Sequence, residues 1–413
     1  MKSLAAILII AMAASCGEVS DPLADGPGNG NNNPPSGDSP TETPGGSEGE
    51  AVELELVFDR QIIHANGEDA AVATVYCQGK VVTEGVTFYD ADFNEVILTD
   101  SKFTTTQVGE YTFWASYEAY VTDNVSVRAV SVPVPSVAAD PQPENTDFVR
   151  RVLMTQITGT ACGYCPKMIE ALESVYAKQE YASKAVLAAS HQFNGDDPAY
   201  AGVELMNQGG APYVYTDMLV NSMMGAYNTA ALTAQYLAGY ITECHKMFPP
   251  VAGISVNSVL DGNSIVFTVG VKAVKDVNNL RVGAWLLEDG IVATQSNYEL
   301  GQSGSYEETH DNCVRIVDSK FKSNDYTGYK LGAIKAGEVK EYLFAWNLDE
   351  NMENPILPWN VITSKGDKKY PNNRKPVLAN CKLLVFVYTS DTQSVNNVIV
   401  CPIEGETPFE YKN

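Results

Sequence analysis

The chain has 413 residues, 45% of them hydrophobic and 19% charged, so it is long enough to build more than one globular core. Its formal net charge is −24 at pH 7, and its 27 Lys and Arg residues are scattered rather than clustered. Such a chain repels phosphate backbones and anionic headgroups, which excludes nucleic acid as an expected partner.

The first residues have the pattern of an export signal. Lys2 supplies a positive charge, residues 4–12 form a short apolar run, and residues 13–15 are small and directly precede Cys16. The apolar run is too short to span a bilayer, and small residues ending at a cysteine resemble the lipobox of bacterial lipoproteins. The resemblance implies that residues 1–16 hold the signal and that Cys16 is lipidated and anchors the chain to a membrane. A cleaved signal with an incidental cysteine is the alternative.

The next two segments differ sharply in composition. Residues 17–50 are rich in Gly, Pro, Asn and Ser and are predicted to be a disordered tether. Residues 51–135 contain short β-branched runs separated by turn signals such as Asn66 and Gly67, which predict a β-sandwich. The run from Gly109 to Thr112 resembles a strand of bacterial Ig-like modules. Prolines between residues 133 and 143 mark a linker.

Residues 148–250 alternate between strand and helix patterns. Apolar runs at 151–157, 185–189 and 213–215 predict strands, and helical spacing follows Cys165 and extends over 232–247. This alternation predicts an α/β layer.

Residues 251–413 return to strand patterns, with a hairpin turn at Asp261 and Gly262, and predict a second β-sandwich.

Cys162 and Cys165 are the residues best suited to chemistry. Spaced i and i+3 at the start of a helix, they lie close enough for a disulfide, and the helix N-terminus favours an anion at Cys162. Such a position lowers a thiol pKa from ~8.5 to ~3.5–7.5. We therefore expect Cys162 to be the nucleophile and Cys165 the thiol that resolves a mixed disulfide.

The surroundings of this motif resemble the thioredoxin superfamily, in which a strand leads into the two cysteines and a cis-proline precedes a later strand. Pro212 matches that proline. The resemblance implies that Ala211 and Pro212 contact an extended substrate beside the cysteines, together with Gly163 and Tyr164 of the motif. Tyr164 either shields the site from water or selects an apolar substrate.

A narrower resemblance covers residues 148–410. The lipobox, the run from Thr158 to Pro166, and a β-rich C-terminal region with the segment His310 to Arg315 look like the outer-membrane-protein-28-related lipoproteins. That resemblance implies an outer-membrane, lipid-anchored protein, periplasmic or surface-exposed. The expected fold is multidomain α+β, with a thioredoxin-like α/β domain (148–250) between an N-terminal Ig-like β-sandwich (51–135) and a C-terminal β-sandwich (251–413).

Two departures from thioredoxins make a general reductase less expected. Gln156 stands where thioredoxins carry a buried acid, and Ala161 replaces the tryptophan before the first cysteine. Because a Gln side chain cannot accept a proton, resolution by Cys165 needs solvent or another base.

The cysteine pair has other interpretations. An inert structural disulfide and a metal site remain open, but His191, Cys244 and His245 complete no zinc spacing, so neither a metal nor a cofactor is expected. The remaining cysteines are odd in number, and a Cys381–Cys401 bridge across a hairpin centred near Asp391 is one hypothesis for two of them. The others are Cys77, Cys244 and Cys313.

The sequence as a whole predicts thiol–disulfide exchange on envelope proteins, whose thiols or disulfides would be the partners. The alternative is a non-catalytic surface binding or structural lipoprotein that uses the thioredoxin-like fold as a scaffold.

Overall fold

The computed structural model describes residues 53–192, 197–200, 205–206, 211–301, 303–321, 325–349, 361–363, 366–368 and 375–412. Residues 52–413 form one compact unit. The predicted signal, the lipidation site at Cys16 and the tether at 17–50 lie outside the described residues. None of the helices in the described ranges is both long and apolar enough to cross a membrane.

The N-terminal part of this unit consists of two sheets with a common core. One has the order β1-β3-β4 with β7 on β3, and the other has the order β2-β10-β8-β5-β6 with β9 on β8. Side chains in β3 alternate between buried and half-buried, as expected for strands with one face on a core. The strands are β1 (Leu54–Phe58), β2 (Ile62–His64), β3 (Ala71–Cys77), β4 (Lys80–Val82), β5 (Val86–Asp90), β6 (Glu95–Val96), β7 (Lys102–Phe103), β8 (Gly109–Tyr117), β9 (Tyr120–Val121) and β10 (Val125–Val130).

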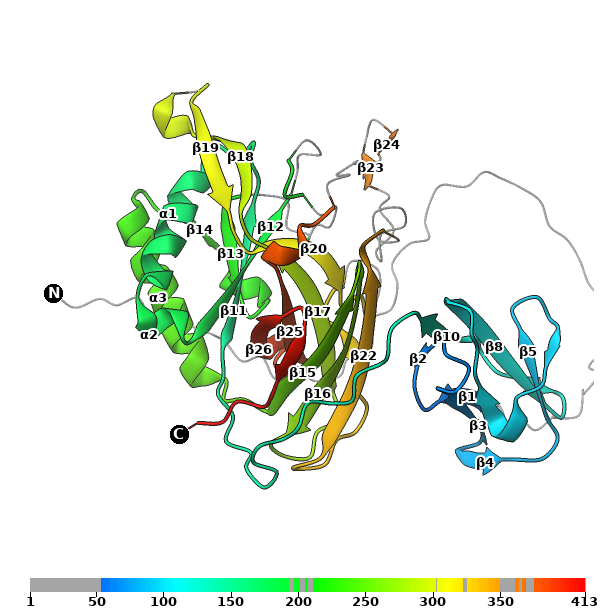
Figure 1. Cartoon of the computed structure of the whole chain (residues 1–413). Coiled ribbons are helices and arrows are strands. Elements are labelled where there is room, and N and C mark those ends of the chain that lie inside the picture. Colours follow the sequence, from blue (N-terminus) through cyan, green and yellow to red (C-terminus); the bar gives the residue numbers. More distant parts are fainter. Residues whose placement is uncertain are drawn as a thin grey trace, which may run out of the picture. The chain divides into compact units, whose positions relative to one another are not determined.

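The middle part is a layer of strands with helices on one face. β11 pairs in parallel with β12 and antiparallel with β13, and α1 and α3 pack side by side against these strands (Figure 1). Every residue of β11 is buried because the strand is covered on both faces. The elements are β11 (Val152–Thr158), α1 (Cys165–Tyr176), α2 (Gln179–Ala182), β12 (Ala185–His191), β13 (Tyr213–Thr216), β14 (Met224–Gly225) and α3 (Ala230–Met247).

The C-terminal part is dominated by two sheets packed over a large apolar core. One sheet has the order β22-β16-β15-β27, and the other includes β20, β17, β25 and β26. The predicted hairpin turn at Asp261 and Gly262 connects β15 to β16. The strands are β15 (Ala252–Asp261), β16 (Ser264–Ala273), β17 (Leu280–Glu288), β18 (Ile291–Ser296), β19 (Ser305–His310), β20 (Cys313–Asp318), β21 (Tyr329–Lys330), β22 (Val339–Asn347), β23 (Val361–Thr363), β24 (Gly366–Lys368), β25 (Cys381–Thr389), β26 (Ser394–Pro402) and β27 (Gly405–Thr407).

One sheet runs through both the middle and the C-terminal parts. Its order is β14-β13-β11-β12-β20-β17-β25-β26, and β12 meets β20 where Ala189 pairs with Cys313. The Ala189 N–H donates to the Asn312 carbonyl at 2.8 Å. The chain is thus mostly β-sheet with several sheets, whereas a division of residues 148–413 into two domains at 250 stays a prediction.

The proline-rich linker is attached to the C-terminal sheet rather than exposed along its length. The ammonium of Lys272, on β16, is buried against Asp140 at 2.8 Å, the Pro143 carbonyl at 2.5 Å and the Tyr411 hydroxyl at 3.2 Å. Thr268 also donates to the Pro135 carbonyl.

The hypothesis of a Cys381–Cys401 bridge is wrong in this structure. The hairpin between β25 and β26 is present, but Cys401 stands opposite Leu383 rather than Cys381, and neither cysteine is in a disulfide. A shift of two residues along the ladder separates their side chains by more than a disulfide spans. Cys77, Cys244 and Cys313 are free thiols.

Candidate functional site

The two cysteines of the motif lie where β11 passes into α1. The Cys162 N–H donates to the Gly159 carbonyl at 3.0 Å and the Cys165 N–H donates to the Cys162 carbonyl at 3.1 Å, so a tight turn precedes the helix. The helix itself begins at Cys165, and the disulfide Cys162–Cys165 joins Cα atoms 5.4 Å apart. Cys162 is half-buried, whereas Cys165 is completely buried.

The predicted proline segment reaches the same end of the sheet. The Ala211–Pro212 peptide bond is cis, and both residues are half-buried. Tyr213 follows directly and pairs with Ile157, the last but one residue of β11 before the cysteine turn. The topology therefore places Pro212 at the same end of the sheet as the cysteine turn, which follows the last residue of β11.

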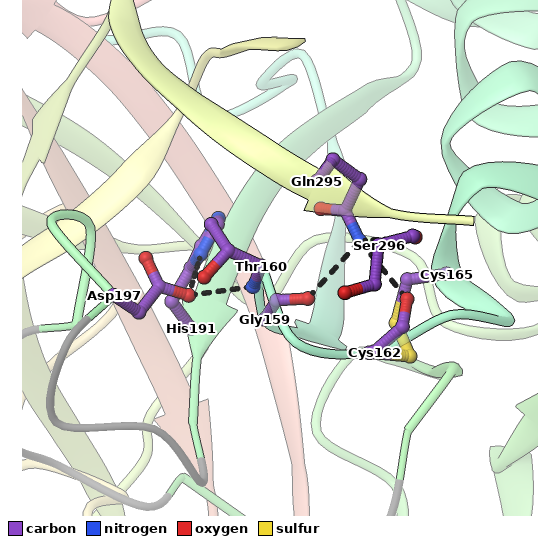
Figure 2. The surroundings of a disulfide bond; sticks show 8 residues. All are labelled: Gly159, Thr160, Cys162, Cys165, His191, Asp197, Gln295 and Ser296. Atoms are coloured by element: carbon purple, nitrogen blue, oxygen red, sulfur yellow. Dashed lines mark hydrogen bonds and ion pairs between the residues drawn. A yellow bond between two sulfur atoms is a disulfide. The ribbon is translucent and has the colours of Figure 1, made fainter. Parts of the chain in front are cut away.

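A hairpin from the C-terminal part binds the backbone of the cysteine turn. Gln295, at 0% exposure on β18, donates through its side-chain amide to the Cys162 carbonyl at 2.9 Å and to the Gly159 carbonyl at 3.3 Å (Figure 2). Next to it, the Ser296 N–H donates to the Thr160 carbonyl at 2.8 Å. Figure 1 shows β18 and β19 as a two-stranded arm beside α1.

The end of this arm covers the motif itself. The Tyr298 N–H donates to the Gly163 carbonyl at 3.0 Å, and the rings of Tyr298 and Tyr164 meet edge to face at 5.0 Å between centroids. Lys167 on α1 forms an ion pair with Glu299 at 2.8 Å. Gly163 is consequently buried, while Tyr164 remains 66% exposed.

A buried carboxylate holds the other side of the turn. Asp197 Oδ2 accepts the Thr160 N–H at 2.7 Å and lies 2.9 Å from Nδ1 of His191 (Figure 2). Burial opposes the charge of Asp197, but the hydrogen bond and charge of His191 and the N–H groups of Thr160 and Ala199 outweigh it and lower the pKa of Asp197 to about 2. The turn is thus fixed by an ionised carboxylate on one side and by Gln295 on the other.

The segment His310 to Arg315 meets the same cluster. The His310 and His191 rings are edge to face at 4.8 Å, and the Cys313 sulfur lies 3.8 Å from His191 Nε2. Burial and the neighbouring His191 lower the pKa of His310 to about 4, and burial strongly raises the pKa of the Cys313 thiol. Cys313 is therefore a buried neutral thiol.

Gln156 occupies β11 with its side chain buried. It is 4% exposed, and its Nε2 has no hydrogen-bond partner among the residues that the structure describes. As expected from its chemistry, it offers no proton acceptor of the carboxylate kind. Cys244 is also buried, and within the described ranges no three metal-binding side chains gather into a group.

Sequence reasoning identified the cysteine turn and the proline but missed Gln295, Tyr298 and Asp197. These residues reach the turn only through the pairing of distant segments, and no spacing in the sequence links them to Cys162. A glycine inside the motif was the one visible sign, because Gly163 leaves room for a close neighbour.

Comparison with known proteins adds a distant structural likeness. No family model matches the chain, and no curated protein matches it. Among solved structures, HBP35 of Porphyromonas gingivalis is similar over 62% of this chain and 76% of its own, with 14% sequence identity and a TM-score of 0.43.

Proposed function

We propose that this chain is a lipid-anchored envelope protein that exchanges thiols and disulfides with other proteins, with a thioredoxin-like segment at 148–250 as its reactive part. The observation that carries the proposal is the unequal burial of the two cysteines. Cys162 is half-buried and can meet another chain, whereas Cys165 is fully buried and can be reached only from within. This inequality suits an attacking thiolate and a resolving thiol.

The exchange balances without a cofactor. The Cys162 thiolate attacks one sulfur of a substrate disulfide, forming a mixed disulfide and releasing the other substrate sulfur as a thiolate that takes up a proton. Cys165 then loses its proton, attacks Cys162 Sγ and releases the second substrate thiol, leaving the Cys162–Cys165 disulfide. The reverse sequence oxidises a substrate dithiol.

The surroundings of Cys162 suit a polypeptide substrate. Ala211 and Pro212 lie at the same end of the sheet as the cysteine turn, and the Tyr164 side chain of that turn is exposed. Tyr298 contributes a second aromatic ring that is 46% exposed. An extended segment with an apolar residue near its cysteine would pack against these two rings.

The test is a trapping experiment with the full-length chain in its envelope. Cys165→Ser leaves the mixed disulfide unresolved, so disulfide-linked partners should accumulate on a non-reducing gel and disappear on reduction. The matched control is Cys162→Ser, which removes the attacking sulfur and should trap nothing. Equal traces from both variants, or none from either, would count against exchange at Cys162.

A second measurement tests the thiolate directly. With reduced protein, alkylation of Cys162 by iodoacetamide should have its midpoint below pH ~7.5, as a thiolate stabilised before a helix requires. A midpoint at the ~8.5 of an ordinary thiol would favour the other candidate.

That other candidate is a non-catalytic binding or structural lipoprotein. The observation in its favour is the arm at β18 and β19, which covers Gly163 and binds the backbone carbonyls of Thr160, Cys162 and Gly163. A locked disulfide of this kind would stabilise the middle part without reacting.

The anchor is tested separately. The Cys16→Ala variant should leave the membrane fraction and appear in the soluble fraction of the envelope, because one cysteine carries the acyl chains. Retention of this variant in the outer-membrane fraction would contradict the lipoprotein proposal without bearing on Cys162.

A further inference from the structure

One buried side chain of the β18–β19 arm supplies hydrogen-bond donors to the backbone of the cysteine turn. The Gln295 amide nitrogen donates to the Cys162 carbonyl at 2.9 Å and to the Gly159 carbonyl at 3.3 Å (Figure 2). Within the turn itself, the same two carbonyls accept the N–H groups of Cys165 and Cys162. Each carbonyl therefore accepts two N–H groups, one from the turn and one from the arm, which is its full capacity.

The Gln295 amide is oriented with its donor side toward the turn. Its nitrogen faces three carbonyl oxygens, because it also donates to the Ser296 carbonyl at 3.1 Å. Gln295 is 0% exposed, and its Oε1 has no hydrogen-bond partner among the residues that the structure describes. A buried unpaired oxygen is rare in folded proteins and needs an explanation. The explanation that fits this place is a need for the donor on the other side of the amide.

Two main-chain donors of the arm reach the neighbouring carbonyls of the turn. The Ser296 N–H donates to the Thr160 carbonyl at 2.8 Å. The Tyr298 N–H donates to the Gly163 carbonyl at 3.0 Å. The side of the turn that meets the arm is thus lined with N–H groups, which carry partial positive charge.

The position of Cys162 makes these donors important for its sulfur. The helix α1 begins at Cys165, so Cys162 lies three residues ahead of it. The effect of a helix dipole is strongest within the first turn of the helix, and a residue ahead of that turn receives less of it. A thiolate at Cys162 therefore depends on other nearby dipoles, and its own carbonyl and that of Gly159 are among the nearest in the chain.

We propose that Gln295 is a positioning residue that makes the thiolate of Cys162 easier to form, acting through the two carbonyls that it binds. This inference rests on the exchange proposed above for Cys162. By donating to the carbonyl oxygens, the amide offsets the negative ends of their dipoles, so a sulfur anion at Cys162 meets less repulsion. Because the dithiol form is then stabilised, the Cys162–Cys165 disulfide becomes a better oxidant.

Two substitutions of Gln295 should shift Cys162 in opposite directions. Gln295→Met keeps the length of the side chain and removes the donor, so the midpoint of Cys162 alkylation by iodoacetamide should rise by about 0.3–1 pH unit, the equivalent of one neutral hydrogen bond. Gln295→Lys presents three N–H donors and adds a positive charge, so the midpoint should fall. Unchanged midpoints, or shifts of both variants in the same direction, would overturn the proposal, because a merely structural role has no sign.

The redox equilibrium of the two cysteines gives an independent measurement. On equilibration with glutathione, Gln295→Met should favour the disulfide about two- to ten-fold more than the native protein does, and Gln295→Lys should favour the dithiol. The matched control is Ile291→Ala, since Ile291 is the first residue of β18 and is 0% exposed. It should loosen the packing of the arm and keep all the donors, so the midpoint and the equilibrium should stay native. Shifts as large as those of Gln295→Met would assign the effect to loosening.

A measurement on the native protein applies even where a variant of Gln295 fails to fold. The side-chain ¹⁵N resonance of Gln295 should titrate with the same midpoint as Cys162, because the charge forms on the residue whose carbonyl binds the amide. A resonance that stays constant through this midpoint would refute the coupling.

These results are distinguishable from a failure of exchange itself. Partners trapped by Cys165→Ser together with unshifted Gln295 variants would support exchange and remove the role of Gln295. Shifted Gln295 variants without trapped partners would support the effect of Gln295 on the thiol and remove exchange with other proteins.

Discussion

The ring of Tyr298 lies directly against Gly163. A residue with a side chain at position 163 would not leave room for the ring. A Cβ atom added to Gly163 would lie 2.3–2.5 Å from ring atoms of Tyr298, well inside van der Waals contact. The Tyr298 N–H also donates to the Gly163 carbonyl, so the ring is held in place through its own backbone. Gly163, between the two cysteines, is therefore constrained by the turn that follows β18, far away in the sequence.

Replacing this glycine should displace the arm. We expect Gly163→Ala to lower the free energy of unfolding by about 1–3 kcal/mol, the usual cost of overpacking. Urea unfolding of the variant and of the native protein measures this difference in free energy. The matched control is Gly239→Ala in α3, where nothing lies within 4 Å of the added Cβ and the change should stabilise the protein by ~0.5–1 kcal/mol.

A double variant separates a clash with Tyr298 from a loss of backbone freedom. If the ring is the cause, Gly163→Ala should cost little in a Tyr298→Ala background, giving a coupling energy of about 1 kcal/mol or more. Additive effects of the two substitutions would show that the ring is not what the new side chain meets.

Gln295 should matter for the same turn through hydrogen bonds rather than packing. Gln295→Leu removes the amide that donates to the Cys162 and Gly159 carbonyls. Because both carbonyls then lose this hydrogen bond in a buried environment, we expect the unfolding free energy to fall by ~1–3 kcal/mol. Val292→Ala is the control, because Val292 lies on the same strand but is 55% exposed and should change stability by less than ~0.5 kcal/mol. A neutral Gln295→Leu variant would mean that water replaces these bonds.

Local patterns predicted much of the fold. The helix expected over 232–247 is Ala230–Met247, where Thr229 caps the first turn, and the strand expected over 151–157 is β11 at Val152–Thr158. These elements could be predicted because their signals, apolar periodicity and capping, lie within a few residues of one another.

What no local pattern predicts depends on contacts between distant segments. The pairing of Ala189 with Cys313 brings β12 beside β20, and the diagonal offset of Cys381 and Cys401, which makes the bridge hypothesis wrong, follows from a register that no local pattern specifies. The same limit applies to the site. Cys162 and Pro212 could be predicted from the motif, whereas Asp197 and Tyr298 reach the turn through tertiary structure alone.

Lys272 should be among the most sensitive positions outside the site. Its ammonium is buried and holds the linker through Asp140 and the Pro143 carbonyl. Lys272→Met should lower the unfolding free energy by about 3–5 kcal/mol, because it leaves the partly buried Asp140 carboxylate without its cation and the Pro143 carbonyl without its donor. Lys335→Met is the control: its ion pair with Asp276 is mostly exposed and should be worth less than ~1 kcal/mol. Equal effects would mean that the buried ammonium contributes no more than a surface pair.

His310 should make stability depend on pH in a defined window. Burial and the neighbouring His191 lower its pKa to about 4 in the folded protein, against ~6.5 in the unfolded chain. Between these values the unfolded chain binds a proton that the folded protein does not, so the unfolding free energy should rise from pH ~4 to pH ~6.5 and level off above. The whole contribution is at most ~3 kcal/mol. Because carboxylates titrate in the same range, the measurement is the difference between the native protein and His310→Gln, followed by urea unfolding across the window. Parallel curves would show that the pKa of His310 is the same in the two states. A native protein that loses stability relative to His310→Gln as the pH falls from ~6.5 to ~4 would confirm the buried neutral ring.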